Sequence, residues 1–297
     1  MRPIRALLIY LILVFFGGAL LAPWLWHLAQ IFSSFSPKAA HAPFHRFLDR
    51  SFLILALAGI WPLMRSLGAT SWREVGLSLP YGQMKKLGGG LLLGLLSLAV
   101  VAAIEIAAGR RVFNHAATHQ MAAVISSAMA TAALVGVLEE ILFRGALFGG
   151  LRRVLPWPVA LGLSSIIYAF VHFLRSADVS GPVAWDSGLI LLPHLFDLHA
   201  FIPAFLGLTL AGILLGLAYH RTGNLYFSIG LHAGWIFVLK LFGALTVASP
   251  GIAVAFWGSS KMVDGWLAFL VLMLMLATFR FLPLEDRHPP YMLCKLK

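Results

Sequence analysis

The sequence has little charge. Of its 297 residues, 11% are Asp, Glu, Lys or Arg and 60% are hydrophobic, and the mean hydropathy is +0.90. A soluble domain carries about 25% charged residues, so this supply cannot cover a water-exposed surface. The composition, together with apolar runs longer than about 18 residues, predicts a membrane protein with several spans. It excludes a secreted disulfide scaffold, a Rossmann-type enzyme and a disordered regulator.

Cysteine and acidic residues are also scarce. Cys294 is the single cysteine, which excludes an intrachain disulfide framework and a cysteine metal cluster. The 22 Lys and Arg outnumber the 11 Asp and Glu, for a net charge of +11. Such a charge can attract nucleic acid, but here the basic residues lie in short loops between apolar runs, as membrane topology requires. We therefore expect the lipid bilayer, and no nucleic acid, as a partner.

The apolar runs predict an all-α fold with about eight transmembrane helices in one membrane domain, 1–297. The predicted spans are 6–32, 51–64, 87–108, 121–143, 156–174, 201–219, 225–247 and 266–282. The first run is too long for a signal peptide and is predicted to be a retained anchor. The mixture of Trp, Leu, Lys and Arg in 71–86 indicates an interfacial segment that lies on the bilayer. Basic residues are more numerous on the side of both termini, which predicts that the termini are cytoplasmic.

Ionisable residues inside the predicted spans are few, and each is costly. A charge at the bilayer centre costs at least about 2.5 kcal/mol on insertion scales, so each one is a candidate functional residue. They are Glu105, Glu139, Glu140, Arg144, His172, His232 and Lys240. Glu105 is expected to pair with Arg110 or Arg111. An acidic pair and two histidines on three different spans indicate one shared wet cavity within the helix bundle.

The acidic pair divides by its helical spacing. Glu140 and Arg144 are one turn apart and can form an ion pair, whereas Glu139 points about 100° away from them. A desolvated carboxylate without a fixed cation suits general base catalysis, so the chemistry is assigned to Glu139. The alternative is a salt cluster that only pins two helices. A single histidine in an apolar helix, such as His172 or His232 taken alone, is more often a buried, hydrogen-bonded core residue than a catalyst.

Several protease signatures are missing. No histidine is followed by glutamate, which excludes His-Glu-x-x-His zinc proteolysis. Every aspartate lies in a loop or at the edge of a span, which excludes an aspartyl pair. Gly-x-Ser-x-Gly is absent, which argues against a serine dyad that uses Ser164 or Ser165. One mechanism remains. A carboxylate activates water with help from one histidine, and a second histidine donates a hydrogen bond to the oxyanion.

Three ordered motifs now stand out: Glu139-Glu140-x-x-x-Arg144, Tyr168-x-x-x-His172, and His232 followed by Ala-Gly-Trp. They resemble the motifs of the CPBP family of intramembrane proteases, which includes CAAX prenyl endopeptidases, over a catalytic core at 122–240. The resemblance implies an eight-helix endopeptidase that cleaves a membrane-associated protein or peptide. It further implies that Glu139 and His172 activate the water, that Glu140, Arg144 and Tyr168 support them, and that His232 stabilises the oxyanion.

Two positions depart from the family pattern. Tyr168 replaces the usual phenylalanine, and Ile236 replaces a polar residue, usually Asn, four positions after His232. Isoleucine cannot donate a hydrogen bond, and loss of an oxyanion donor can lower a rate by about 10² to 10³. Lys240 lies one turn further on. Either it supplies the missing oxyanion donor, or its side chain extends to the membrane–water interface, which is the alternative that we favour.

Other hypotheses stay open at this point. Some family members are described as metalloproteases, and Glu139, His172 and His232 form a conceivable zinc triad, although metal-free glutamate chemistry is favoured. A non-catalytic scaffold or immunity protein of the same fold, or a transporter, are the rivals from other classes. The resemblance favours a bacterial or archaeal plasma membrane. It leaves the substrate, its prenylation and the oligomeric state open.

Overall fold

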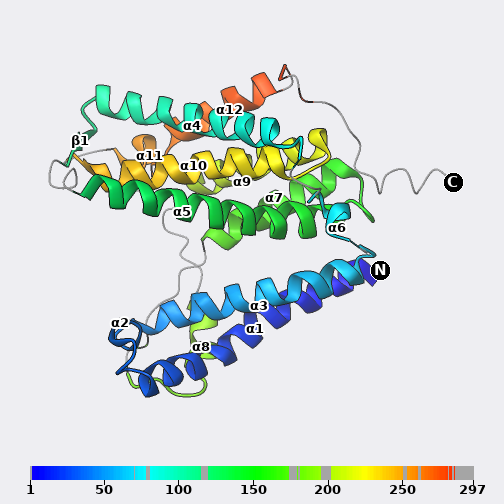
Figure 1. Cartoon of the computed structure of the whole chain (residues 1–297), viewed down its shortest axis with the longest axis vertical. Coiled ribbons are helices and arrows are strands. Elements are labelled where there is room, and N and C mark those ends of the chain that lie inside the picture. The colour runs from blue at the N-terminus through cyan, green and yellow to red at the C-terminus, as the bar shows by residue number, and fades with distance from the viewer. Residues whose placement is uncertain are drawn as a thin grey trace. The chain divides into compact units, whose positions relative to one another are not determined.

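The protein is almost entirely helical, which confirms the predicted all-α class (Figure 1). The computed structural model describes residues 2–69, 71–77, 81–114, 120–173, 179, 181–194, 202–249, 253–259, 262–279, 281–282 and 284. The longer helices are α1 (Arg2–Ile31), α3 (Phe44–Ser66), α4 (Met84–Ala107), α5 (Met121–Glu139), α7 (Trp157–His172), α9 (Ile202–Thr222), α10 (Tyr226–Leu245) and α12 (Trp266–Phe279). Directly after α5 comes η3 (Glu140–Phe148), a π-helix.

The remaining elements are short. They are α2 (Pro37–Ala40), η1 (Trp72–Val75), α6 (Gly149–Leu151), α8 (Ser187–Leu191), η4 (Leu192–His194) and α11 (Val254–Trp257), with the strands β1 (Arg111–Phe113) and β2 (Thr246–Ala248). The strands follow α4 and α10 and pair antiparallel, with Arg111 opposite Ala248. The Arg111 Nε donates to Thr246 Oγ1 at 3.0 Å, which ties the ends of α4 and α10 together.

Six of the described helices are long and apolar enough to cross a membrane. They are Arg5–Ile31, Phe44–Ser66, Met84–Ala107, Met121–Leu151, Ile202–Thr222 and Tyr226–Leu245. The predicted spans 156–174 and 266–282 coincide with α7 and α12, which have 16 and 14 residues, shorter than the about 20 that a span requires. A helix thus lies at each predicted place, but the count of eight spans is not confirmed.

One boundary predicted from hydropathy is wrong. The second span, predicted at 51–64, is the 23-residue helix α3. Its first turns carry the charged Arg46 and Arg50, which are exposed, while Phe47 and Leu48 are buried, so a hydropathy window misses a helix that is amphipathic there. The interfacial segment predicted at 71–86 forms η1 and then enters α4 at Met84; residues 78–80 lie outside the described part.

The chain divides into two compact units, one of 1–69 with 170–199, the other of 70–169 with 200–297. In the first unit α1 and α3 lie side by side, and Phe15 and Phe52 pack edge to face at 5.4 Å (Figure 1). The short helix α8 touches α1 so closely that a Cβ added to Gly188 would lie 2.0 Å from Ala19 O. The helix α8 is thereby held on α1.

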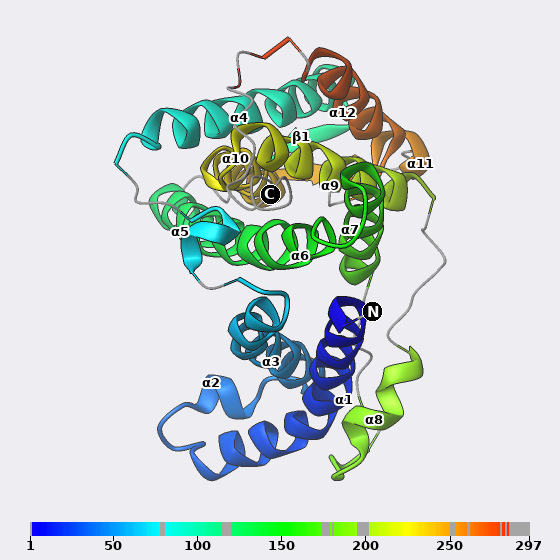
Figure 2. The same ribbon diagram turned by 90° about the vertical axis from the view of Figure 1, so that its right-hand side faces the viewer.

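In the second unit α4 and α10 lie side by side and run in the same direction (Figure 1, Figure 2). Their backbones nearly touch, because a Cβ added to Gly94 would lie 2.3 Å from Leu231 O, and one on Gly230 would lie 2.0 Å from Leu87 O. Small residues allow this approach in a membrane protein. We call this contact the glycine seam, formed by Gly90, Gly94, Gly230 and Gly234.

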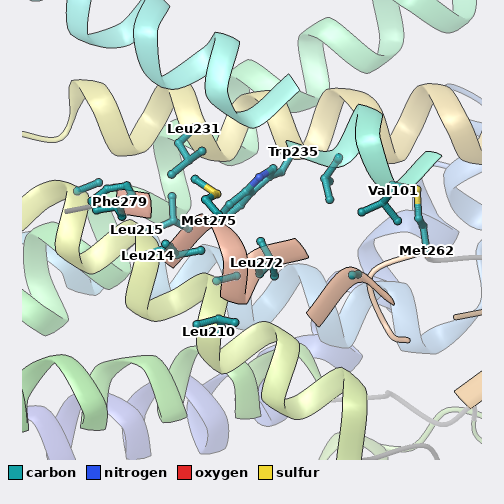
Figure 3. Close-up of a cluster of buried hydrophobic side chains, with 14 of the residues drawn as sticks. Val101, Leu210, Leu214, Leu215, Leu231, Trp235, Met262, Leu272, Met275 and Phe279 are labelled. Atoms are coloured by element: carbon teal, nitrogen blue, oxygen red, sulfur yellow. The ribbon is translucent and has the colours of Figure 1, made fainter. Parts of the chain in front are cut away.

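The core of the second unit is an apolar cluster in which α4, α9, α10 and α12 meet (Figure 3). Trp235 of α10 is 5% exposed, and its indole Nε1 donates to Ser97 Oγ of α4 at 2.9 Å. The hydroxyl of Ser97 donates in turn to Gly94 O at 3.0 Å. The seam and this hydrogen bond together fix the position of α10, the helix that carries His232.

Candidate active site

The helix α5 buries one narrow face. The buried residues of α5 recur every four positions, at Ala128, Ala132 and Gly136. A Cβ on Gly136 would lie 3.3 Å from the backbone nitrogen of Ala233, so this face packs on α10. The same spacing continues to Glu140 and Arg144, which are also buried. The helix face that packs on α10 therefore continues into η3 and places a carboxylate, Glu140, and a guanidinium, Arg144, inside the protein.

The helix changes character at the acidic pair. α5 ends at Glu139, and the nine-residue π-helix η3 begins at Glu140. Such turns are rare, usually single, and frequent at functional sites. A π-helical turn still keeps residues four apart on nearly one face, so the alignment of Glu140 with Arg144 survives the change.

Glu140 and Arg144 form the predicted ion pair. Arg144 Nη1 donates to Glu140 Oε1 at 2.8 Å, and the two side chains are 3% and 0% exposed. The guanidinium also lies 4.3 Å from the centre of the Tyr168 ring, a cation–π contact. Two buried charges in such contact are held firmly, because either one alone would be uncompensated.

His232 lies between the two glutamates. Its Nδ1 is 3.0 Å from Glu140 Oε1, and its Nε2 is 3.8 Å from Glu139 Oε2. The Oη of Tyr168 lies 3.5 Å from the same Nε2. An ionised carboxylate only accepts hydrogen bonds, so Nδ1 carries the proton donated to Glu140. Nε2 is therefore the nitrogen that faces Glu139 and Tyr168.

The two glutamates differ in exposure. The side chain of Glu139 is 27% exposed, whereas that of Glu140 is fully buried. Glu140 is committed to Arg144 and His232 inside the protein, while Glu139 reaches both His232 and the surrounding space. The predicted division of labour, in which Glu140 supports the site and Glu139 meets the water, stays a prediction.

His172 is the last residue of α7, one turn after Tyr168, and its side chain is exposed. It lies three residues beyond Ala169, where the chain passes from one compact unit into the other. The pairing of His172 with Glu139 therefore stays a prediction.

The other polar residues of the predicted spans lie apart. Ile236 is half-buried and Lys240 is exposed, one and two turns after His232 on α10. Glu105 is 2% exposed, and in the described part of the chain no ion pair joins it to Arg110 or Arg111. Arg111 still interacts electrostatically with Glu105, while its guanidinium donates to Thr246. The predicted partner is therefore near Glu105, but not in direct contact with it.

The structure brings His232 and Glu139 of the conceivable zinc triad together, and the triad itself stays a hypothesis. Among the described residues, no group of three or more His, Cys, Asp or Glu side chains could hold a metal ion. The ring nitrogens of His232 face Glu140 on one side and Tyr168 with Glu139 on the other.

Sequence reasoning missed two polar neighbours of the site. Ser228 is fully buried one turn before His232, and its side chain interacts with Glu140. Its four-residue spacing from His232 was the signal available in the sequence. The second neighbour is Ser97 of α4, whose hydroxyl accepts a hydrogen bond from Trp235. The two residues are 138 positions apart in the sequence, so no local pattern predicts their contact.

The comparisons can now be set beside this geometry. Residues 120–238 match the family model described as Type II CAAX prenyl endopeptidase Rce1-like. No curated protein and no solved structure matched the chain. The matched residues agree with the predicted core 122–240 and contain all three motifs, from Glu139 to His232. This match confirms the resemblance to CAAX-protease-type endopeptidases over residues 120–238, which are less than half of the chain.

Proposed function

We propose that the protein hydrolyses a peptide bond of a membrane-associated protein or peptide with water that Glu139 activates. The observation that carries the proposal is the meeting of three helices at His232: Glu139 and Glu140 come from the α5–η3 junction, and Tyr168 comes from α7. Such a polar cluster is costly inside a membrane protein and is an expected feature of a catalytic cavity.

The proposed reaction has two steps. Glu139, assisted by His172, takes a proton from water, and the water oxygen forms a bond to the carbonyl carbon of the substrate, whose π electrons move to the carbonyl oxygen. The oxyanion is stabilised by His232 in its doubly protonated form, in which Nδ1–H donates to Glu140 and Nε2–H donates to the oxyanion. The carbonyl then re-forms, the carbon–nitrogen bond breaks, and the proton held by Glu139 goes to the leaving amine. The products are a carboxylic acid and an amine, so water is the only co-reactant.

Glu140 and Arg144 act as positioning residues in this proposal. Glu140 accepts the Nδ1 proton of His232, and Arg144 holds Glu140 at 2.8 Å. The imidazole is thus fixed in orientation before substrate arrives, which is the preorganisation that electrostatic catalysis requires. Tyr168 closes the other side of the ring.

A zinc-dependent reaction is the alternative mechanism. It predicts that exhaustive chelation abolishes cleavage, that added zinc restores it, and that metal analysis of the active protein finds zinc. Glutamate chemistry predicts full activity after chelation. The donors around His232 favour the glutamate mechanism, because both ring nitrogens already face protein groups.

The substrate, the membrane and the topology belong to the same proposal. The matched family acts on prenylated CAAX proteins by its description, so a farnesylated peptide is the first probe to use. We place the protein in a bacterial or archaeal plasma membrane with both termini cytoplasmic, since basic residues are more numerous on that side. Reporter fusions to either terminus test the orientation.

A non-catalytic scaffold or immunity protein is the second candidate, favoured by Ile236 at a position where a polar donor is expected. It predicts that Glu139→Gln leaves the biological effect unchanged. A transporter, the third hypothesis, predicts coupled ion flux in reconstituted vesicles.

The test uses the full-length protein in liposomes and two internally quenched peptides, one with a farnesylated cysteine and one without. The wild type is expected to cleave a peptide, while Glu139→Gln and His172→Ala are inert although folded. Glu105→Gln is the matched control, because it removes a buried carboxylate on α4 away from the site. Equal cleavage by the wild type and Glu139→Gln contradicts the proposal.

A further inference from the structure

The oxyanion position beside His232 lacks a donor on α10. Ile236, one turn after His232, has no group that can donate a hydrogen bond. An oxyanion is normally held by more than one preorganised donor, and loss of one costs about 10² to 10³ in rate. Lys240, two turns after His232 on α10, is exposed, so we look for the second donor on another helix.

Tyr168 brings a hydroxyl to this place from α7. Its side chain is 3% exposed, and its Oη lies 3.5 Å from His232 Nε2. The ring is held in position because it meets Phe143 edge to face at 5.0 Å and lies 4.3 Å from the Arg144 guanidinium. A phenylalanine would fill the same space without the hydroxyl.

We infer, on the basis of the proposed function, that the Tyr168 hydroxyl is a catalytic hydrogen-bond donor to the oxyanion and replaces the donor that Ile236 cannot supply. When His232 is protonated on both nitrogens, Nδ1–H stays bonded to Glu140 and Nε2–H is a donor. Tyr168 Oη and His232 Nε2 are 3.5 Å apart, so both can lie about 2.8 Å from one oxygen atom and donate to it. In the resting protein the hydroxyl faces Nε2. When negative charge develops on the substrate carbonyl oxygen, the hydroxyl turns to that stronger acceptor.

The Arg144 guanidinium strengthens this arrangement. It lies on the face of the Tyr168 ring and places positive charge beneath the donor. A fixed positive charge near a developing negative charge needs no reorganisation during the reaction. The phenol, the imidazole and the guanidinium thus form one continuous group around the place where the oxyanion forms.

The test is Tyr168→Phe, assayed with the farnesylated quenched peptide in liposomes. We expect kcat to fall by about 10²-fold with KM nearly unchanged, because the lost hydrogen bond exists only in the transition state. Ile236→Asn in the Tyr168→Phe background restores a donor on α10 and is expected to recover much of kcat. Tyr10→Phe is the matched control, since it removes a tyrosine hydroxyl bonded to Ala56 O at 2.9 Å in the other unit.

The outcomes separate this inference from the proposed function. Cleavage by the wild type, none by Glu139→Gln, and an unchanged kcat for folded Tyr168→Phe would overturn the inference alone. A fall in both Tyr168→Phe and Tyr10→Phe, matched by a lower thermal unfolding temperature, would show a structural role and also overturn it. Equal cleavage by the wild type and Glu139→Gln would overturn the proposed function and the inference with it.

Discussion

The glycine seam makes the position of His232 depend on α4, a helix outside the matched core. In Gly94→Ala the new Cβ would lie 2.3 Å from Leu231 O, the carbonyl of the residue before His232. An ordinary carbon–oxygen contact requires about 3.4 Å, so α4 and α10 must separate by about 1 Å. A displacement of that size in a catalytic group can cost on the order of 10² in rate.

The close contact of the new Cβ with Leu231 O is also expected to lower the stability of Gly94→Ala. Overpacking of a tight contact costs about 1 to 3 kcal/mol. Over most of that range the cost exceeds the gain of about 1 kcal/mol from replacing glycine by alanine in a helix. Gly88→Ala is the matched control on α4, since a Cβ there meets nothing within 4 Å and gains the same helix propensity. We expect Gly94→Ala to lose kcat and thermal stability, and Gly88→Ala to lose neither.

The assay measures kcat on the quenched peptide and the unfolding temperature of each variant in the same liposomes. A Gly94→Ala protein with the kcat and stability of Gly88→Ala would refute the reasoning. It would mean that the seam can relax without moving His232.

Two further predictions concern the supports of the site. Arg144→Ala leaves the fully buried Glu140 without its cation and is expected to destabilise the protein by about 3 to 5 kcal/mol; an unchanged unfolding temperature contradicts this. Ser97→Ala and Trp235→Phe each remove one partner of the 2.9 Å hydrogen bond, worth about 0.6 kcal/mol in a membrane protein. If both act through that bond, the double variant is less destabilised than the sum of the single variants, and strict additivity disproves the coupling.

The parts of the fold that follow local rules could be predicted from the sequence. A helix lies at every predicted span because each apolar run must satisfy its backbone hydrogen bonds internally. The prediction for α3 was wrong at its start because Arg46 and Arg50 lie on an exposed face of a helix that buries Phe47. Hydropathy averages over faces and cannot distinguish such a turn from a loop.

The site follows the same division between local and distant contacts. The Glu140–Arg144 ion pair was predictable because it depends on a spacing of four residues within one helix. The contact of both glutamates with His232 was not, because it depends on how α5 packs against α10 across 92 residues of sequence. The change to a π-helix at Glu140 also left no local pattern that the prediction could use.

The central claim is that the Glu139 carboxylate is needed to break a peptide bond. The most direct measurement compares the peptide termini found in cell membranes that contain the wild type with those that contain an equal amount of Glu139→Gln. Our account predicts at least one terminus that depends on Glu139 and a corresponding uncut precursor in the variant. Identical sets of termini, with both proteins inserted and folded, would contradict it.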